Sequence, residues 1–221
     1  MRFLKQIMLA LSLCGAAALA AGGAAAEPKN GAQYQTLPTP QNTDAGKKVE
    51  VTEFFAYYCP HCYVLEPALA AWVKKQGDNI VFKRIHVARD ENVAPQQRLF
   101  FTLEALGLAD QLNAKVFEAM HVERQRLNRD EQVFDFAEKN GVERKKFSDT
   151  YRSFGVSARI RRAGEMMAAY KVDSWPMIAI DGRFITSPSL ANQNARDEAE
   201  LHQQTLAVMD YLVATAKAEK K

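Results

Sequence analysis

Two cysteines separated by two residues, Cys59 and Cys62, stand directly after a long apolar run, and this arrangement limits the possible folds more than any other feature. Residues 48–58, KVEVTEFFAYY, are rich in β-branched and aromatic side chains, as in a strand buried on both faces. Pro60 then suits the first turn of a helix, and apolar residues follow at helical spacing. The sequence therefore predicts a strand that leads into a helix, with Cys59 at its first turn.

The first 26 residues have the pattern of a cleaved signal peptide. A basic start and an apolar core over residues 7–21 precede a small-residue cleavage site at 24–26. An uncleaved membrane anchor is the alternative, but the apolar stretch is short and rich in alanine and glycine. Cleavage removes two basic and no acidic residues, so the formal net charge falls from +3 to +1. We therefore expect an exported protein that does not bind nucleic acid.

Export changes what the cysteine count means. Of three cysteines, Cys14 lies in the signal segment, so the mature chain keeps only Cys59 and Cys62. A disulfide scaffold would show several pairs at larger separations. A bridge that closes a four-residue ring removes almost no loop entropy from the unfolded chain. The pair is therefore better explained by chemistry than by stability.

A metal centre is another use of this spacing. Zinc sites built on one C-x-x-C usually need a second ligand pair, and His86, His121 and His202 are isolated from one another in the sequence. Covalent haem attachment requires histidine directly after the second cysteine, where Tyr63 stands. We therefore expect no metal and no soluble cofactor, because the cysteine pair itself is the redox group.

The residues around the pair suggest an asymmetric redox centre. Cys59 would face the unpaired N–H groups and the positive dipole end of the helix, which lower its pKa, and His61 can add a charge or a donor. Cys62 would lie beneath it, shielded from solvent. Such a pair forms a strongly oxidising disulfide. Glu53 is either a buried acid that exchanges a proton with Cys62 or an ordinary solvated carboxylate, whereas Glu50 is expected at the surface.

The start of the chain predicts an α/β frame. Residues 33–37 form a possible short edge strand, and a second long strand is expected over residues 79–88. The helix between the two long strands has an apolar stripe and contains Pro67, which should kink it. Strand, helix and strand in about forty residues are typical of a βαβ unit with a parallel pair.

The middle of the chain breaks this alternation, which indicates a helical insertion. Helices are predicted over residues 95–106, 109–122, 129–140, 143–154 and 157–170. Asn128 and Glu131 suggest a capping box for the third of them.

A β-hairpin and a long helix are expected at the end of the chain. Strands over residues 176–180 and 183–186 flank an Asp181-Gly182 turn. The last helix, residues 195–217, is expected to bury one apolar face, comprising Leu201, Leu206, Met209, Leu212 and Val213. Trp175-Pro176 precedes the hairpin: a cis bond would expose a peptide-pairing edge, although trans is the commoner form.

These features together resemble the DsbA family of periplasmic thiol:disulfide oxidoreductases, within the thioredoxin superfamily. The resemblance rests on EFFAYYCPHC, the signal, the βαβ start, the insertion and WPMIAIDGRF, and extends from about Tyr34 to the last helix. It implies an α/β, thioredoxin-like fold with an inserted helical domain. Residues 27–88 and 172–221 would form the thioredoxin-like domain, and residues 89–171 the inserted one.

The resemblance also implies roles for individual residues. Cys59 matches the nucleophilic cysteine, Cys62 the buried resolving cysteine and Glu53 the buried acid; Pro60 and His61 complete the catalytic motif. Pro176 matches a cis-proline that faces the site. Two departures stand out. Trp175 replaces a common Val or Thr in the substrate groove, and Arg84 stands where a lysine often partners the acid, so no relay role is transferred to it.

The function implied is that of a monomeric periplasmic dithiol oxidase. It would donate the Cys59–Cys62 disulfide to newly exported, folding proteins by thiol–disulfide exchange. A quinone-linked inner-membrane protein of the DsbB type would re-oxidise it. A reductase or isomerase of the same fold, and a non-catalytic, chaperone-like peptide-binding protein, are the alternatives.

Overall fold

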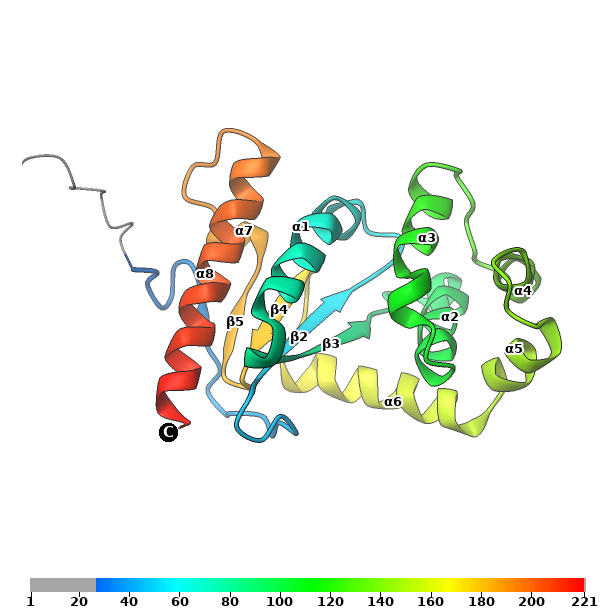
Figure 1. The fold of residues 1–221 in the computed structure, drawn as a ribbon, viewed down its shortest axis with the longest axis horizontal. Coiled ribbons are helices and arrows are strands. Elements are labelled where there is room, and N and C mark those ends of the chain that lie inside the picture. Colours follow the sequence, from blue (N-terminus) through cyan, green and yellow to red (C-terminus); the bar gives the residue numbers. More distant parts are fainter. Residues whose placement is uncertain (1–26, 221) are drawn as a thin grey trace, which may run out of the picture.

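The computed structural model describes residues 27–220, so the expected signal peptide with Cys14 lies outside the described residues. Its centre is a five-stranded mixed sheet with strand order β1-β5-β4-β2-β3 (Figure 1). The strands are β1 (Gln35–Thr36), β2 (Val49–Phe55), β3 (Ile80–His86), β4 (Met177–Ile180) and β5 (Phe184–Thr186). Only β2 and β3 pair in parallel, as the βαβ pattern predicted, and β1 is the expected edge strand.

The central strand β2 delivers the chain to the cysteine pair. All seven of its residues are buried, as expected for a strand covered on both faces. It ends at Phe55, earlier than the predicted residue 58, because the chain turns: the N–H of Cys59 donates to the carbonyl of Ala56 at 3.1 Å. Helix α1 (Pro60–Gln76) starts directly after this turn and contains Pro67, as predicted.

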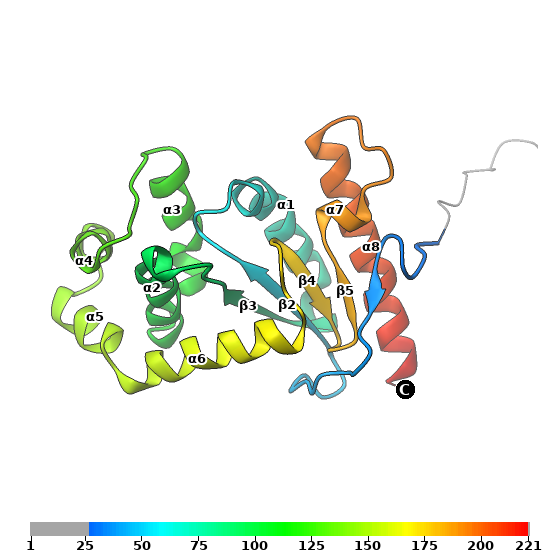
Figure 2. The ribbon, with the colours of Figure 1, turned by 180° about the vertical axis from the view of Figure 1, so that it is seen from behind.

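Helices α1 and α8 (Glu198–Glu219) lie together on one face of the sheet (Figures 1 and 2). Leu65 and Leu69 from α1 and Leu212 from α8 share a core with β2 and β4. The Trp72 indole N–H donates to Asp210 at 2.8 Å and joins the two helices.

The buried face predicted for the last helix was partly wrong. Met209, Leu212 and Val213 are buried, but Leu206 is only half-buried because it lies about 100° around the helix from the buried Thr205. Leu201 is also half-buried, because it lines a cleft near Pro176 instead of packing under the sheet.

The helical insertion lies between β3 and β4 and confirms the predicted run of helices. It comprises α2 (Ala94–Ala105), α3 (Ala109–His121), α4 (Asp130–Lys139), α5 (Arg144–Tyr151) and α6 (Phe154–Ala169). Helix α6 returns along the sheet face opposite α1 (Figure 2). The predicted capping box was wrong: Arg129 is the residue at the N-cap of α4, and the N–H of Asn128 bonds to the side chain of Gln132 instead. A short helix, α7 (Pro188–Ala191), was not predicted.

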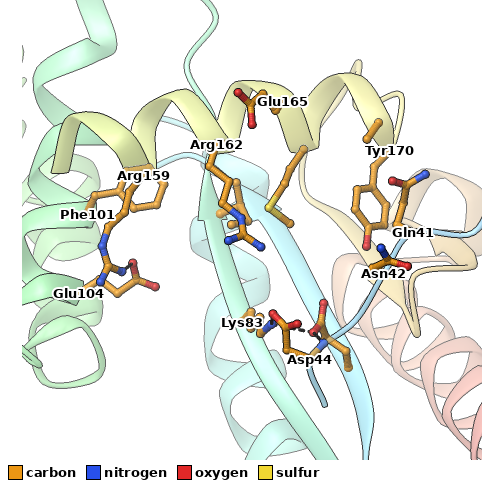
Figure 3. Close-up of a pocket in the computed structure, with 15 residues that line it drawn as sticks. Gln41, Asn42, Asp44, Lys83, Phe101, Glu104, Arg159, Arg162, Glu165 and Tyr170 are labelled. Carbon is orange, nitrogen blue, oxygen red and sulfur yellow. Dashed lines mark hydrogen bonds and ion pairs between the residues drawn. The ribbon is translucent and has the colours of Figure 1, made fainter. Parts of the chain in front are cut away.

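Glu50 was expected at the surface, and this was wrong. Its side chain is 4% exposed, because the segment around Asp44 folds over the start of β2 and Lys83 reaches across from β3. Lys83 Nζ lies 2.7 Å from Glu50 and 3.7 Å from Asp44. This cluster forms one wall of a cavity of about 580 Å³ under α6, into which Arg162 points (Figure 3).

The predicted two-residue turn joins β4 to β5. The N–H of Arg183 donates to the carbonyl of Ile180 at 3.1 Å, and Asp181 and Gly182 both have positive φ angles, as a type I′ turn requires. The backbone of Gln41 packs against this turn, and its N–H donates to the Gly182 carbonyl at 2.8 Å. No helix within residues 27–220 combines the length and apolar character needed to cross a membrane.

Replacing Gly182 by alanine should destabilise the protein. The added Cβ would meet the Gln41 carbonyl oxygen at 2.1 Å, at a φ of +66°. We expect a loss of about 2–4 kcal/mol in the free energy of unfolding, measured by urea denaturation. Gly164→Ala on α6 is the matched control, because its Cβ meets nothing within 4 Å; it should stabilise by about 0.5–1 kcal/mol. A Gly182→Ala variant as stable as the parent would contradict this account of the turn.

Candidate active site

Cys59 is the N-cap residue of α1. Its backbone is extended, with φ −83° and ψ 116°, Pro60 opens the helix behind it, and its Sγ accepts a hydrogen bond from the N–H of Cys62 at 3.2 Å. A sulfur in this position interacts with N–H groups that have no partner inside the helix. The sequence-based placement of Cys59 at the helix start is therefore confirmed.

The surroundings of Cys59 lower the pKa of its thiol below the ordinary value. The hydrogen bond from the Cys62 side chain lowers it most; burial acts in the opposite direction, and the backbone N–H groups of Cys62 and His61 add to the lowering. His61 thus acts on the thiol through its backbone, while the residue itself is exposed and lines the cleft beside the site.

Cys62 has the opposite character. It is fully buried, whereas Cys59 is 5% exposed. Burial raises the pKa of the Cys62 thiol far above its ordinary value, and its hydrogen bond to Cys59 and the charges of Cys59 and Glu53 raise it further. Both cysteines are free in this structure. In the reduced pair, the surroundings therefore favour the negative charge on Cys59 and the proton on Cys62.

The segment before β4 faces Cys59. The Trp175–Pro176 peptide bond is cis, and the Trp175 carbonyl lies 3.6 Å from the Cys59 Sγ. The Trp175 ring meets the Tyr58 ring edge-on at 6.2 Å, and the Arg89 guanidinium lies over Tyr58 at 5.2 Å. This stack fixes the position of Trp175 on one side of the redox pair.

A cleft of about 270 Å³ opens on the other side of Trp175. His61 and Pro176 line it, together with Leu201 and His202 from α8. The structure thus brings His61 together with Trp175 and Pro176, more than 100 positions away in the sequence, next to Cys59.

A buried acid lies behind the pair, on β2. Glu53 is fully buried and faces Arg84 across the parallel β2–β3 register, with Arg84 Nε 2.9 Å from its Oε2. The same guanidinium binds both carboxylate oxygens of Glu66 at 2.9 Å, and Asn113 from α3 donates to Glu66 at 2.8 Å. Glu53 Oε1 has no hydrogen-bond partner among the described residues.

The charges of this cluster explain why Glu53 keeps its proton up to near neutral pH. Burial raises the pKa of Glu53 from its ordinary 4.5 to about 7, against the attraction of Arg84 and with the help of the Glu66 charge. One guanidinium balances only one of the two carboxylates, so the other retains a proton up to near neutral pH. Of the two interpretations of Glu53, a buried acid or a solvated carboxylate, the first is therefore correct. Arg84, to which the sequence analysis gave no role, is the fixed counter-ion, because a guanidinium does not release its proton.

Sequence reasoning missed Glu66, although its position carried a signal. Glu66 follows Cys62 by four residues in α1, so the two side chains share one face of the helix. Asn113, which is 3% exposed, offered no such signal, because only the packing of α3 against α1 brings it to Glu66.

Two histidines hold the turn before Cys59. The Tyr57 N–H donates to His86 Nε2 at 3.0 Å, and the Tyr57 carbonyl accepts from His121 Nε2 at 2.7 Å. Burial lowers the pKa of His86 to about 3, so its imidazole is neutral. These residues lie 29 and 64 positions from Tyr57, and no spacing in the sequence links them to it. Within residues 27–220, no group of three or more His, Cys, Asp and Glu side chains could hold a metal ion.

Replacing Glu53 by glutamine should make stability less dependent on pH. A folded-state pKa above the unfolded one adds stability that is complete below pH 4.5 and is lost as the pH rises through about 7. The unfolding free energy of Glu53→Gln relative to the parent should therefore increase from pH 4.5 to 8, by at most about 3 kcal/mol. Glu165→Gln on the exposed face of α6 controls for net charge. A difference that stays constant with pH would show that Glu53 is ionised throughout.

Comparisons with known proteins agree with this geometry. Residues 50–197 match the DSBA-like thioredoxin domain. The chain is 36% identical over 220 residues to the thiol:disulfide interchange protein DsbA of Burkholderia cepacia, covering 99% of both chains, and 28% identical over 218 residues to that of Pseudomonas aeruginosa, covering 99% of this chain and 100% of the relative.

Solved structures are similar over most of the chain. The crystal structure of Pseudomonas aeruginosa DsbA has a TM-score of 0.78 at 30% identity, and covers 86% of this chain and 94% of that one. The Xylella fastidiosa oxidoreductase DsbA has a TM-score of 0.77 at 25% identity, and covers 86% and 98%. The thioredoxin-like fold with a helical insertion, predicted from the sequence, is therefore confirmed. The protein belongs to the DsbA family and is a thiol:disulfide oxidoreductase.

Proposed function

We propose that this protein oxidises pairs of cysteines in newly exported proteins, in the periplasm, with a disulfide between Cys59 and Cys62. The observation that carries the proposal is the asymmetry of the two thiols: the pKa of Cys59 is lowered and that of Cys62 is raised. A stabilised thiolate favours the reduced pair, so the disulfide is readily transferred to another protein. Because its thiolate is the more stable of the two, Cys59 is also the better leaving group when the client disulfide forms.

The reaction has two exchange steps. A client thiolate attacks Cys59 Sγ, which breaks the Cys59–Cys62 bond, forms a mixed disulfide and releases Cys62 as a thiolate. Glu53, protonated below about pH 7, is the proton donor that we assign to Cys62. A second client thiolate then attacks the client sulfur of the mixed disulfide, and Cys59 leaves as its stabilised thiolate. The client loses two electrons, and the cysteine pair gains them.

The neighbouring residues receive roles within this scheme. Pro60 and His61 complete the catalytic motif, and Trp175 and Pro176 present the edge along which the client chain binds. The Trp175 carbonyl oxygen lies 3.6 Å from Cys59 Sγ, and this short distance supports the assignment. Residues 27–88 with 172–221 would act as the redox domain, and residues 89–171 as the inserted domain that covers it.

The cycle needs an oxidant to restore the disulfide. We assign this step to a quinone-linked inner-membrane protein of the DsbB type, and we expect the oxidase to act as a monomer without a soluble cofactor. A reductase or isomerase of the same fold would need a less stable Cys59 thiolate, which the hydrogen bonds at the start of α1 disfavour. A peptide-binding, chaperone-like protein would keep its function after Cys59→Ser.

Cys62→Ala should trap mixed disulfides between Cys59 and client proteins. The Cys59 thiolate attacks a disulfide of the client, and one client sulfur leaves as a thiolate. Without the Cys62 thiol, the mixed disulfide is not resolved from within the protein, and covalent adducts accumulate. The adducts are measured as bands on non-reducing gels that disappear with dithiothreitol. The double variant Cys59→Ala/Cys62→Ala is the control and should form none. A Cys62→Ala protein that forms no adduct with exported proteins that contain a disulfide would remove Cys62 from the resolving role.

A further inference from the structure

A second cleft, of about 660 Å³, lies beyond Tyr58 on the side of the helical insertion. It is lined by residues of the segment before α2, by the end of α3 and by the loop that follows α3. Three of its lining residues are arginines, namely Arg89, Arg124 and Arg126. The proposed chemistry of the cysteine pair does not use this cleft. Arg89 was described above only for its stack over Tyr58, and Arg124 and Arg126 have no role in the exchange.

The formally charged side chains that line the cleft are all arginines. No aspartate or glutamate is among its lining residues, whereas the cavity under α6 contains carboxylates as well as basic groups. Arg89 pairs with its exposed neighbour Asp90 at 3.2 Å. Within residues 27–220, neither Arg124 nor Arg126 has a carboxylate at ion-pair distance; the nearby Glu123 is engaged with Gln125 and Lys139. The two guanidinium groups are therefore free to bind an anion.

The loop that carries these arginines is held in place by buried contacts. Gln96, which is 3% exposed, donates from its amide to the Arg126 carbonyl at 2.8 Å. The N–H of Gln125 donates to the carbonyl of Ala119 at 2.9 Å. Because the backbone is fixed, binding an anion here does not require the loop to be ordered first.

The shape of the cleft favours a polypeptide over a lipid surface. The arginines stand around a concave site of about 660 Å³, on a loop whose backbone is held by Gln96. A side chain of a bound polypeptide can enter such a site, whereas a flat anionic membrane surface cannot follow it.

The cleft is linked to the redox pair through Tyr58. Arg89 lies over the Tyr58 ring, the ring meets Trp175, and the Trp175 carbonyl lies beside Cys59. A client chain bonded to Cys59 and continuing over Tyr58 would reach Arg89, at the edge of the cleft, within about three to five extended residues.

We propose that this cleft binds acidic side chains of the client polypeptide, on one side of the cysteine under attack. It would give the protein a preference among clients according to the charge next to the reactive cysteine. The proposal rests on the proposed oxidase function and adds no step to the exchange reaction.

The test compares short peptides that carry two cysteines. One set has three glutamates placed three to five residues before the first cysteine, a second set has them after the last cysteine, and a third has glutamines at both places. We expect the oxidised protein to react about threefold to tenfold faster with one acidic set than with the glutamine set at low salt. The other acidic set should show no such advantage, and 0.5 M salt should remove it.

Variants assign the preference to the cleft. In the variant Arg124→Gln/Arg126→Gln, the oxidation rate of the preferred acidic peptides should fall to less than about twice that of the glutamine peptides. The control Arg161→Gln/Arg162→Gln removes the same charge from exposed positions on α6 and should keep the ratio.

Equal rates for all peptides in the parent protein, or an equal loss of the rate ratio in the control, would overturn the proposal. It would also be overturned if the cleft variant lost binding to anionic phospholipid vesicles while keeping the peptide ratio. Absence of oxidation of the glutamine peptides would instead contradict the oxidase function itself.

Discussion

The pair of hydrogen bonds from Cys62 to the Cys59 sulfur, one from the thiol and one from the backbone N–H, is the interaction on which the active site depends. It exists because β2 ends in a tight turn and Pro60 starts α1 immediately, so Cys59 becomes the N-cap residue of α1. Two histidines, the buried His86 and the half-buried His121, hold this turn through the Tyr57 peptide. The sheet, the turn and the helix together therefore convert an ordinary cysteine into one whose thiolate is stabilised.

A second constraint is the ratio of charges behind the pair. Arg84 faces two buried carboxylates, Glu53 and Glu66, and balances only one of them. Since the guanidinium does not titrate, the proton of the cluster must reside on a carboxyl group, and Glu53 holds it to about pH 7. Asn113 extends the cluster to α3, so the helical insertion contributes to the electrostatics of the redox centre. With an arginine here, proton exchange within this cluster is left to its carboxyl groups.

The sequence predicted features that depend on local order. Periodicity and the position of Pro60 placed Cys59 at a helix start, and the alternation of elements predicted the parallel pair and the insertion. Features that depend on packing between distant segments were missed. Glu50 is buried because residues near Asp44 cover it, and His86 and His121 meet Tyr57 only in the folded chain. The residues alone favoured a trans Trp175–Pro176 bond, which the structure contradicts, and only the family resemblance favoured the observed cis form.

The equilibrium between the Cys59–Cys62 pair and a glutathione buffer tests the central claim most directly. If the hydrogen bonds at the start of α1 stabilise the Cys59 thiolate, the pair should stay reduced in buffers that contain mostly oxidised glutathione, and its reduction potential should lie well above that of glutathione. The fraction reduced can be read from thiol alkylation after acid quenching. A pair that remains oxidised in mostly reduced glutathione would contradict the claim and identify the protein as a reductase.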